Sequence, residues 1–259
     1  MNKSAISSPA VRGFGAICLL VLAFPASVMA QTNPQAGPFA IPRITRTGDF
    51  AIASTGDFTY LALSVNRLHG LGKSHRFKIG YGLRFTSGFG GKTDYATAPA
   101  RLTSGTQSIV ALFTETIENN IDTLHLTKAQ VNSLNLSINL EYAITKRLSV
   151  GANIDAIGFS FGSQQSGTFQ ANAPVRSALS NTVQTAKPTS FNLLLVSDSD
   201  LGSLNSEYYV RYRIRPELSL RAGLGFLFTE YTTSRKLTLE NDRFRSKNYL
   251  PMVAVSYHF

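Results

Sequence analysis

The sequence has no tryptophan, a single cysteine and few charged residues. Charged side chains make up 15% of its 259 positions, against about 25% in an ordinary soluble domain. The one cysteine, Cys18, lies in a segment that we expect to be removed, which excludes a disulfide scaffold and a zinc–thiolate site. Intrinsic disorder is excluded as well, because 43% of the residues are hydrophobic and 10% are aromatic.

The first thirty residues are predicted to be a cleavable signal peptide. Lys3 and Arg12 precede the apolar stretch 14–24, and Ala30 ends a small-residue cleavage site. Removing 1–30 takes Lys3 and Arg12 from the 25 basic residues and no acid from the 15, which leaves 23 against 15 and a net charge of +8. Residues 31–43 would then form a periplasmic N-terminal segment.

After residue 30, no stretch approaches the ~18 consecutive apolar residues that a membrane helix needs. Hydropathy instead alternates with period two, most clearly over 218–228 and 134–144. These alternating stretches are long enough for a tilted membrane strand of about nine to eleven residues, whereas strands of soluble sandwiches have about five or six. Any membrane crossing is therefore expected to use strands.

The connections between the alternating stretches are short and long in turn. Residues 70–75, 145–147 and 215–217 form tight turns, whereas the connections over about 90–132, 162–205 and 232–248 are long. Short periplasmic turns and long surface loops are typical of outer-membrane barrels. A soluble lipocalin-like barrel is the alternative, but structureless loops of that length count against it.

The number of strands follows from parity. Seven strands are predicted at 58–67, 76–89, 132–144, 148–161, 206–214, 218–231 and 248–259. An even number keeps the N-terminus in the periplasm, so 44–53 is taken as the eighth strand, although it alternates poorly. Residues 109–113 and 191–196 would raise the count to ten. The predicted fold is all-β: a transmembrane antiparallel up-and-down β-barrel over 44–259, with eight strands or ten.

The C-terminus carries a resemblance to a known class. Tyr257-His258-Phe259 ends the chain and resembles the aromatic ending of bacterial outer-membrane barrels, which the barrel-assembly machinery reads. The match is partial, since Met252 and Ala254 stand where that class prefers a polar residue and glycine. Residues 76–84 and 187–196 also resemble small outer-membrane barrel proteins of Gram-negative, Bacteroidetes-type bacteria. The resemblance implies the cell outer membrane, with Tyr257 and Phe259 as assembly signal, and no reaction.

Charged side chains opposite the apolar faces are expected to point into the barrel. An eight-stranded barrel is just filled by side chains, so buried charges there should pair. They are Lys78, Arg84, Glu141, Asp155, Glu207, Arg211, Arg213 and Arg221. The structural interpretation is an internal ion-pair network that plugs the barrel, and the functional one is an ion-selective path that favours anions.

The third long loop contains a run of basic residues. Arg235, Lys236, Arg243, Arg245 and Lys247 could contact the phosphates of lipopolysaccharide. The alternative is a solvated hairpin whose charges keep it soluble. Nucleic acid is not expected as a partner, because the compartment is wrong.

Evidence for catalysis is weak, and no cofactor or metal motif is present. His125 is the only histidine in a long loop, with Asp122, Ser104, Ser108 and Ser133 nearby in sequence. The sequence favours a non-enzymatic outer-membrane barrel that serves envelope integrity or surface interaction through its loops. A small pore or carrier for anionic or hydrophobic solutes is the alternative, and a hydrolase or lipid A-modifying enzyme is third.

Overall fold

Alternating apolar and polar residues make almost the whole described chain extended. The computed structural model describes residues 37, 39–103, 117–195 and 199–259, so the predicted signal peptide and the predicted strand 109–113 lie outside it. The described chain is all-β and antiparallel, as predicted, but its sheet has thirteen strands. The predicted total of eight or ten strands was therefore wrong for the sheet as a whole.

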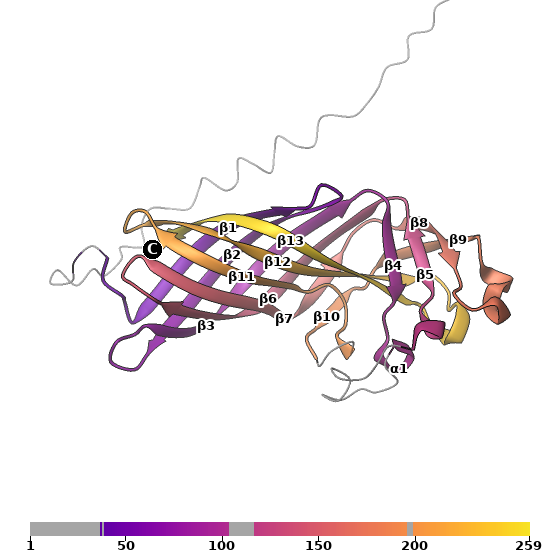
Figure 1. Cartoon of the computed structure of the whole chain (residues 1–259), viewed down its shortest axis with the longest axis horizontal. Coiled ribbons are helices and arrows are strands. Elements are labelled where there is room, and N and C mark those ends of the chain that lie inside the picture. The colour runs from indigo at the N-terminus through magenta and orange to yellow at the C-terminus, as the bar shows by residue number, and fades with distance from the viewer. Residues whose placement is uncertain (1–36, 38, 104–116, 196–198) are drawn as a thin grey trace, which may run out of the picture.

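Eight of the thirteen strands pair in a closed ring, the barrel wall (Figure 1). In chain order they are β1 (Ile44–Ser54), β2 (Phe58–Leu71), β3 (Phe77–Gly90), β6 (Ala129–Ala143), β7 (Leu148–Phe161), β11 (Asn205–Arg213), β12 (Leu218–Thr233) and β13 (Arg243–His258). Each pairs with the next, and β13 pairs back to β1. Closure leaves no edge strand, which is what a membrane requires of a sheet.

The other five strands come from the segments predicted as long loops. They are β4 (Thr93–Thr97), β5 (Thr123–Leu126), β8 (Gln165–Gln170), β9 (Thr182–Pro188) and β10 (Phe191–Leu193). In their described parts, the same segments also hold four short helices: α1 (Ala100–Thr103), η2 (Glu118–Asn120), η3 (Pro174–Leu179) and η5 (Thr238–Glu240).

Four of these strands build a second ring beyond the barrel. β4 pairs with β13, β5 with β4, β8 with β5, β9 with β8, and β9 returns to β12. The ring of β12, β13, β4, β5, β8 and β9 is called the surface ring here, and its added strands lie at the end away from the C-terminus (Figure 1). β12 and β13 belong to both rings because each has 16 residues.

The outer face of the barrel wall is an apolar band. Leu136 and Leu224 are 54% and 57% exposed, although both are large hydrophobic residues. Exposed aromatic residues border the band at both ends: Tyr142, Tyr212 and Tyr257 on the side of the short turns, and Phe159, Phe161 and Tyr249 on the other. Such girdles mark the two interfaces of a transmembrane barrel. None of the helices among the described residues is long and apolar enough to span a membrane.

One irregularity changes which residues of β7 face outward. The register between β6 and β7 shifts so that Leu136 faces Ile157 while Ser137 faces Asp155, which leaves Ala156 as the extra residue of a β-bulge. Val150 is exposed before the bulge, and Ile157 and Phe159 are exposed after it. The bulge keeps apolar residues outside along the whole strand while Asp155 stays inside.

Candidate functional site

The lumen next to the short turns is filled by charged side chains that we call the charged layer. The structure brings seven of the eight predicted residues together there and adds Asp49: the layer holds Asp49, Lys78, Arg84, Glu141, Asp155, Glu207, Arg211 and Arg221. All eight are buried. Four bases face four acids, so the layer is neutral.

Arg84 is the most heavily bonded cation of this layer. Its Nε and Nη2 each lie 2.9 Å from Oδ1 of Asp155, and its Nη1 lies 3.4 Å from Oε1 of Glu207. Nη1 also donates to Asn153 at 2.9 Å. Two donors of the guanidinium thus converge on one carboxylate oxygen, and these charge-assisted contacts offset the cost of removing the charges from water.

Arg211 and Arg221 share the remaining carboxylates. Nη1 of Arg221 lies 2.6 Å from Asp49, and its Nη2 donates to Glu207. Nη1 of Arg211 lies 2.5 Å from Glu141, and its Nη2 lies 3.6 Å from Asp49. Each carboxylate therefore connects two cations or one cation and an amide, so the ion pairs form one connected network.

Amides and a tyrosine complete the layer. Asn66 donates to Asp49 at 3.0 Å, Asn135 to Asp155 at 2.8 Å and Asn153 to Glu207 at 3.0 Å. The guanidinium of Arg221 stands 4.0 Å from the ring centre of Tyr209, a cation–π contact. The amides bind carboxylate oxygens beside the ion pairs, while Oδ1 of Asp49 has no hydrogen-bond partner among the described residues.

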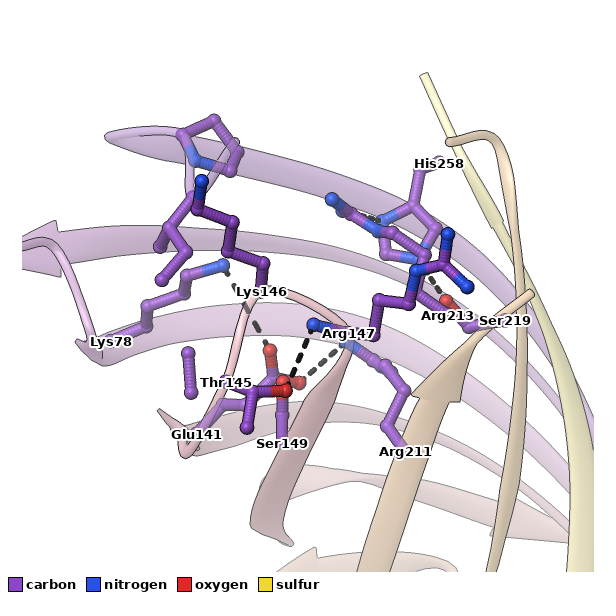
Figure 2. A pocket seen from close by; sticks show the side chains of 13 residues that line it. Lys78, Glu141, Thr145, Lys146, Arg147, Ser149, Arg211, Arg213, Ser219 and His258 are labelled. Atoms are coloured by element: carbon purple, nitrogen blue, oxygen red, sulfur yellow. Dashed lines mark hydrogen bonds and ion pairs between the residues drawn. The ribbon is translucent and has the colours of Figure 1, made fainter. Parts of the chain in front are cut away.

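Arg213 is the predicted member that stays outside the network. At the mouth of the barrel, its Nη2 contacts Nδ1 of His258 at 3.1 Å (Figure 2). Its Nη1 donates to the Ala40 carbonyl at 3.5 Å. Asp49 was missed because it lies on β1, whose alternation is poor. The sequence did contain an indication that Asp49 points inward: it lies two and four residues after the polar residues Thr47 and Thr45, on the same face of the strand.

The lumen next to the surface ring is filled by apolar side chains that we call the aromatic layer. Every strand of the surface ring contributes to it: Tyr95, Leu124, Phe169, Ala186, Tyr231 and Phe244 are each 0% exposed. Tyr95 and Tyr231 pack edge to face with ring centres 5.1 Å apart, and Phe169 packs on Phe244 at 6.1 Å. Burial raises the pKa of Tyr95, so its neutral hydroxyl bonds Thr229 at 2.9 Å.

Two tyrosines connect this layer to its surroundings. The Tyr231 hydroxyl donates to the Gln130 carbonyl and accepts from the Gln130 amide, both at 3.0 Å, which joins β12 to β6 across the lumen. Tyr60 points toward the charged layer, where its hydroxyl lies 3.4 Å from Glu207. A Cβ on Gly225 would lie 2.1 Å from that hydroxyl, so only glycine leaves room for Tyr60.

The predicted lipopolysaccharide contacts separate into two groups. Arg245 is buried and its Nη2 lies 2.7 Å from Glu230, and Arg243 Nε lies 2.8 Å from the same residue. Arg245 is therefore not available to lipopolysaccharide, because the buried Glu230 already holds it. Arg235, Lys236 and Lys247 have exposed side chains. Glu230 was missed because its position in the alternation points outward, where the connection that contains Thr189 and Asp200 covers it.

The remaining predicted residues lie apart from the lumen. Tyr257 is exposed on the outer face of β13, and the amide of Phe259 donates to the carbonyl of Arg46 next to it. His125 pairs with Asp94, at 2.7 Å, on the exposed face of the surface ring. Asp122 is buried and instead binds Arg176 at 2.9 Å. Ser104 and Ser108 lie outside the described residues, and within these no cluster of metal-ligating side chains occurs.

No protein-family model matches the chain, and no curated protein matches it. Several of the solved structures to which the chain is similar are outer-membrane proteins. The Neisserial surface protein A has 10% identity and a TM-score of 0.34, covering 83% of this chain and 96% of that one. A major outer membrane protein from Thermus thermophilus has 14% identity and a TM-score of 0.36, covering 84% and 100%. The attachment invasion locus protein Ail of Yersinia pestis has 9% identity and a TM-score of 0.31, covering 83% and 95%.

Identities and TM-scores this low do not establish a family, and the resemblance to Bacteroidetes-type proteins stays a prediction. The location rests on the barrel itself. A closed antiparallel ring with an apolar outer band and aromatic girdles is the architecture of bacterial outer-membrane proteins. The chain is located in the outer membrane.

Proposed function

We propose that the chain is a non-enzymatic outer-membrane barrel that anchors a folded module at the cell surface. The observation that supports this function is that side chains of two layers fill the lumen along its whole length. The charged layer occupies the half next to the short turns and the aromatic layer the half next to the surface ring. An eight-stranded wall has room for side chains but not for an aqueous channel as well.

The surface ring supplies the second part of the proposal. Hydrogen bonds between its strands and a shared apolar core hold the segments that were predicted as loops in one arrangement. A rigid surface binds partners at a lower entropic cost than a mobile one. Envelope integrity or surface interaction is therefore the role that this chain serves.

Bilayer conductance tests the proposal against the pore alternative. The mature protein is folded into lipid, its folded state is checked by its heat-modifiable migration on a gel, and current is recorded across a planar bilayer. We expect no steady conductance. A stable anion-selective current from protein that is folded by the gel criterion would replace the anchor with a pore.

A single substitution tests the outward orientation of the apolar band. Leu224→Arg places a charge near the middle of β12 on the lipid side and should cost about 2–4 kcal/mol of stability. Lys73→Arg, on an exposed turn, is the control that should cost nothing. Equal stability of both variants in urea unfolding from vesicles would reverse the assignment of inside and outside.

Two partners belong to the same proposal. The barrel-assembly machinery is proposed to read Tyr257 and Phe259, and deleting Phe259 should lower the amount of inserted protein. Lipopolysaccharide is proposed to contact Arg235, Lys236 and Lys247, each of which can contribute about 1 kcal/mol near an anionic surface. An unchanged yield after deletion of Phe259 would show that the aromatic ending is incidental.

A further inference from the structure

A pocket opens at the mouth of the barrel on the side of the short turns. Its cavity volume is small, about 20 Å³, and it is partly open to solvent. Figure 2 shows Lys78 and Lys146 on one side, Arg213 and His258 on the other, and Glu141 below them. In an outer-membrane barrel this end faces the periplasm.

The lining of this pocket has a surplus of positive charge. Lys78, Lys146, Arg147, Arg211 and Arg213 line it with a single carboxylate, Glu141, so five cations face one anion. Glu141 already has two ion-pair partners: Nη1 of Arg211 lies 2.5 Å from its Oε2, and Nζ of Lys78 lies 3.9 Å from its Oε1.

Three of the five cations therefore have no ion-pair partner within 4.0 Å among the described residues: Lys146, Arg147 and Arg213. The guanidinium of Arg147 instead stands 4.0 Å from the ring centre of Phe39. The carboxylates of Glu141 and Glu217 attract Arg213 electrostatically, but neither lies within 4.0 Å of it as an ion pair.

One buried donor in the lining is also left without a partner. Arg211 is 3% exposed, yet its Nε has no hydrogen-bond partner in the described part of the chain. Because arginine only donates, the contact of Arg213 makes Nδ1 of His258 an acceptor, and Nε2–H of His258 then donates to Ser219 at 2.7 Å. His258 is thereby neutral and orients Arg213 without neutralising it.

We infer that this pocket binds a phosphate group. Cationic side chains line it from three places: Lys146 and Arg147 from the β6–β7 turn, Lys78 from the start of β3 and Arg213 from the end of β11. The hydroxyls of Thr145, Ser149 and Ser219 stand among them. Guanidinium and ammonium donors combined with hydroxyls are the groups that recognise phosphate oxygens.

The phosphate can come from a soluble periplasmic compound or from a lipid headgroup of the inner leaflet. The pocket lies inside the rim, lined by inward-facing residues such as Lys78 and Glu141, and this favours a ligand that enters from solution. A headgroup would have to reach over the short turns.

Binding of inorganic phosphate tests the inference. The mature protein is folded into phosphatidylcholine nanodiscs, and phosphate is titrated by calorimetry in a buffer without other multivalent anions. We expect saturable binding that weakens roughly tenfold in Lys146→Gln and in Arg213→Gln, since each removes one charge-assisted hydrogen bond. Lys73→Gln is the matched control, because Lys73 is exposed on another short turn of the same end and does not line the pocket.

A second series separates the two sources. In nanodiscs that contain phosphatidic acid, a headgroup ligand would occupy the pocket and abolish the titration, whereas a soluble ligand leaves it unchanged. Absence of binding, or an equal loss in Lys73→Gln, would overturn the site. Lys146 is exposed on a turn, so its variant keeps the test informative if Arg213→Gln fails to fold. The conductance experiment tests the proposed anchor function, and its outcome does not depend on whether this pocket binds phosphate.

Discussion

The two halves of the lumen solve the same packing problem with opposite chemistry. The charged layer fills its part with four cations and four anions, while the aromatic layer fills its part with tyrosine, phenylalanine and leucine. A strand wall of one kind therefore accepts either filling, provided that the charged one is fully paired and the apolar one is fully packed.

The two fillings differ in what damages them. An ion-pair layer is sensitive to the loss of one partner, because the other charge stays buried and uncompensated. An apolar layer is sensitive to lost volume, because the cavity that remains is only partly refilled. We therefore expect the largest loss of stability when one partner of an ion pair is removed. A smaller loss is expected when an apolar side chain is truncated, and a still smaller one when the contact between the two layers is disturbed.

The largest effect is expected for Glu207→Ala. This change removes a carboxylate that binds both Arg84 and Arg221, so the layer gains an uncompensated buried charge. The expected loss is about 3–5 kcal/mol in urea unfolding from vesicles. Glu217→Ala, on an exposed turn, should stay within about 0.5 kcal/mol. Equal stability of the two variants would mean that water enters the charged layer.

Next comes a cavity in the aromatic layer. Leu124 is 0% exposed on β5, and Leu124→Ala should cost about 2–4 kcal/mol by deleting packed methyl groups. Leu220→Ala deletes the same atoms from a side chain that is 47% exposed in the apolar band, where lipid refills the space. Urea unfolding compares the two. A penalty at Leu220 as large as that at Leu124 would argue against a packed surface ring.

A smaller effect is expected where the two layers meet. Gly225→Ala would place a methyl group 2.1 Å from the Tyr60 hydroxyl, which moves Tyr60 away from Glu207. Overpacking of this kind costs about 1–3 kcal/mol. Gly91→Ala is the matched control, because nothing lies within 4 Å of its added methyl group. If both variants unfold at the same urea concentration, the layers are not in contact through Tyr60.

The smallest effect is expected for a charge pair outside both layers. Nζ of Lys236 lies 3.4 Å from Glu240, and the two side chains are 61% and 78% exposed. Lys236→Gln should change stability by less than about 0.5 kcal/mol, since water screens exposed pairs. A thermal melt that shows a loss of more than 1 kcal/mol would indicate that this hairpin is shielded like the charged layer.

The barrel strands were predictable because hydropathy there has period two and one face must meet lipid. The predicted strand 148–161 coincides with β7, and 58–67 begins where β2 begins. The sequence shows that the apolar residues of this strand move from even positions to odd ones at Ala156, since Ile157, Phe159 and Phe161 follow it. This shift can be assigned to a β-bulge only when the partner strand fixes the register.

The surface ring was not predictable from the same signal. β5 has only four residues and β4 five, which is too short for alternation to be distinguished from chance. Their pairing depends on contacts between segments far apart in the sequence, such as Leu124 with Phe169. For the same reason, the partners of Glu230 and Arg245 follow from the way a distant connection covers β12 and β13, not from their own neighbourhood.

The hairpin shared by the two rings also determines how the molecule responds to mechanical force. β12 and β13 stay hydrogen-bonded from Leu218–Tyr257 up to Thr232–Arg243, without a break between membrane and surface. A partner that pulls on the surface ring therefore loads the barrel wall along its strands, so that the bonds of β12 to β11 and of β13 to β1 are sheared together. The hairpin part of the surface ring therefore cannot be peeled away bond by bond, whereas β4 and β9 are held to it by two and three residue pairs.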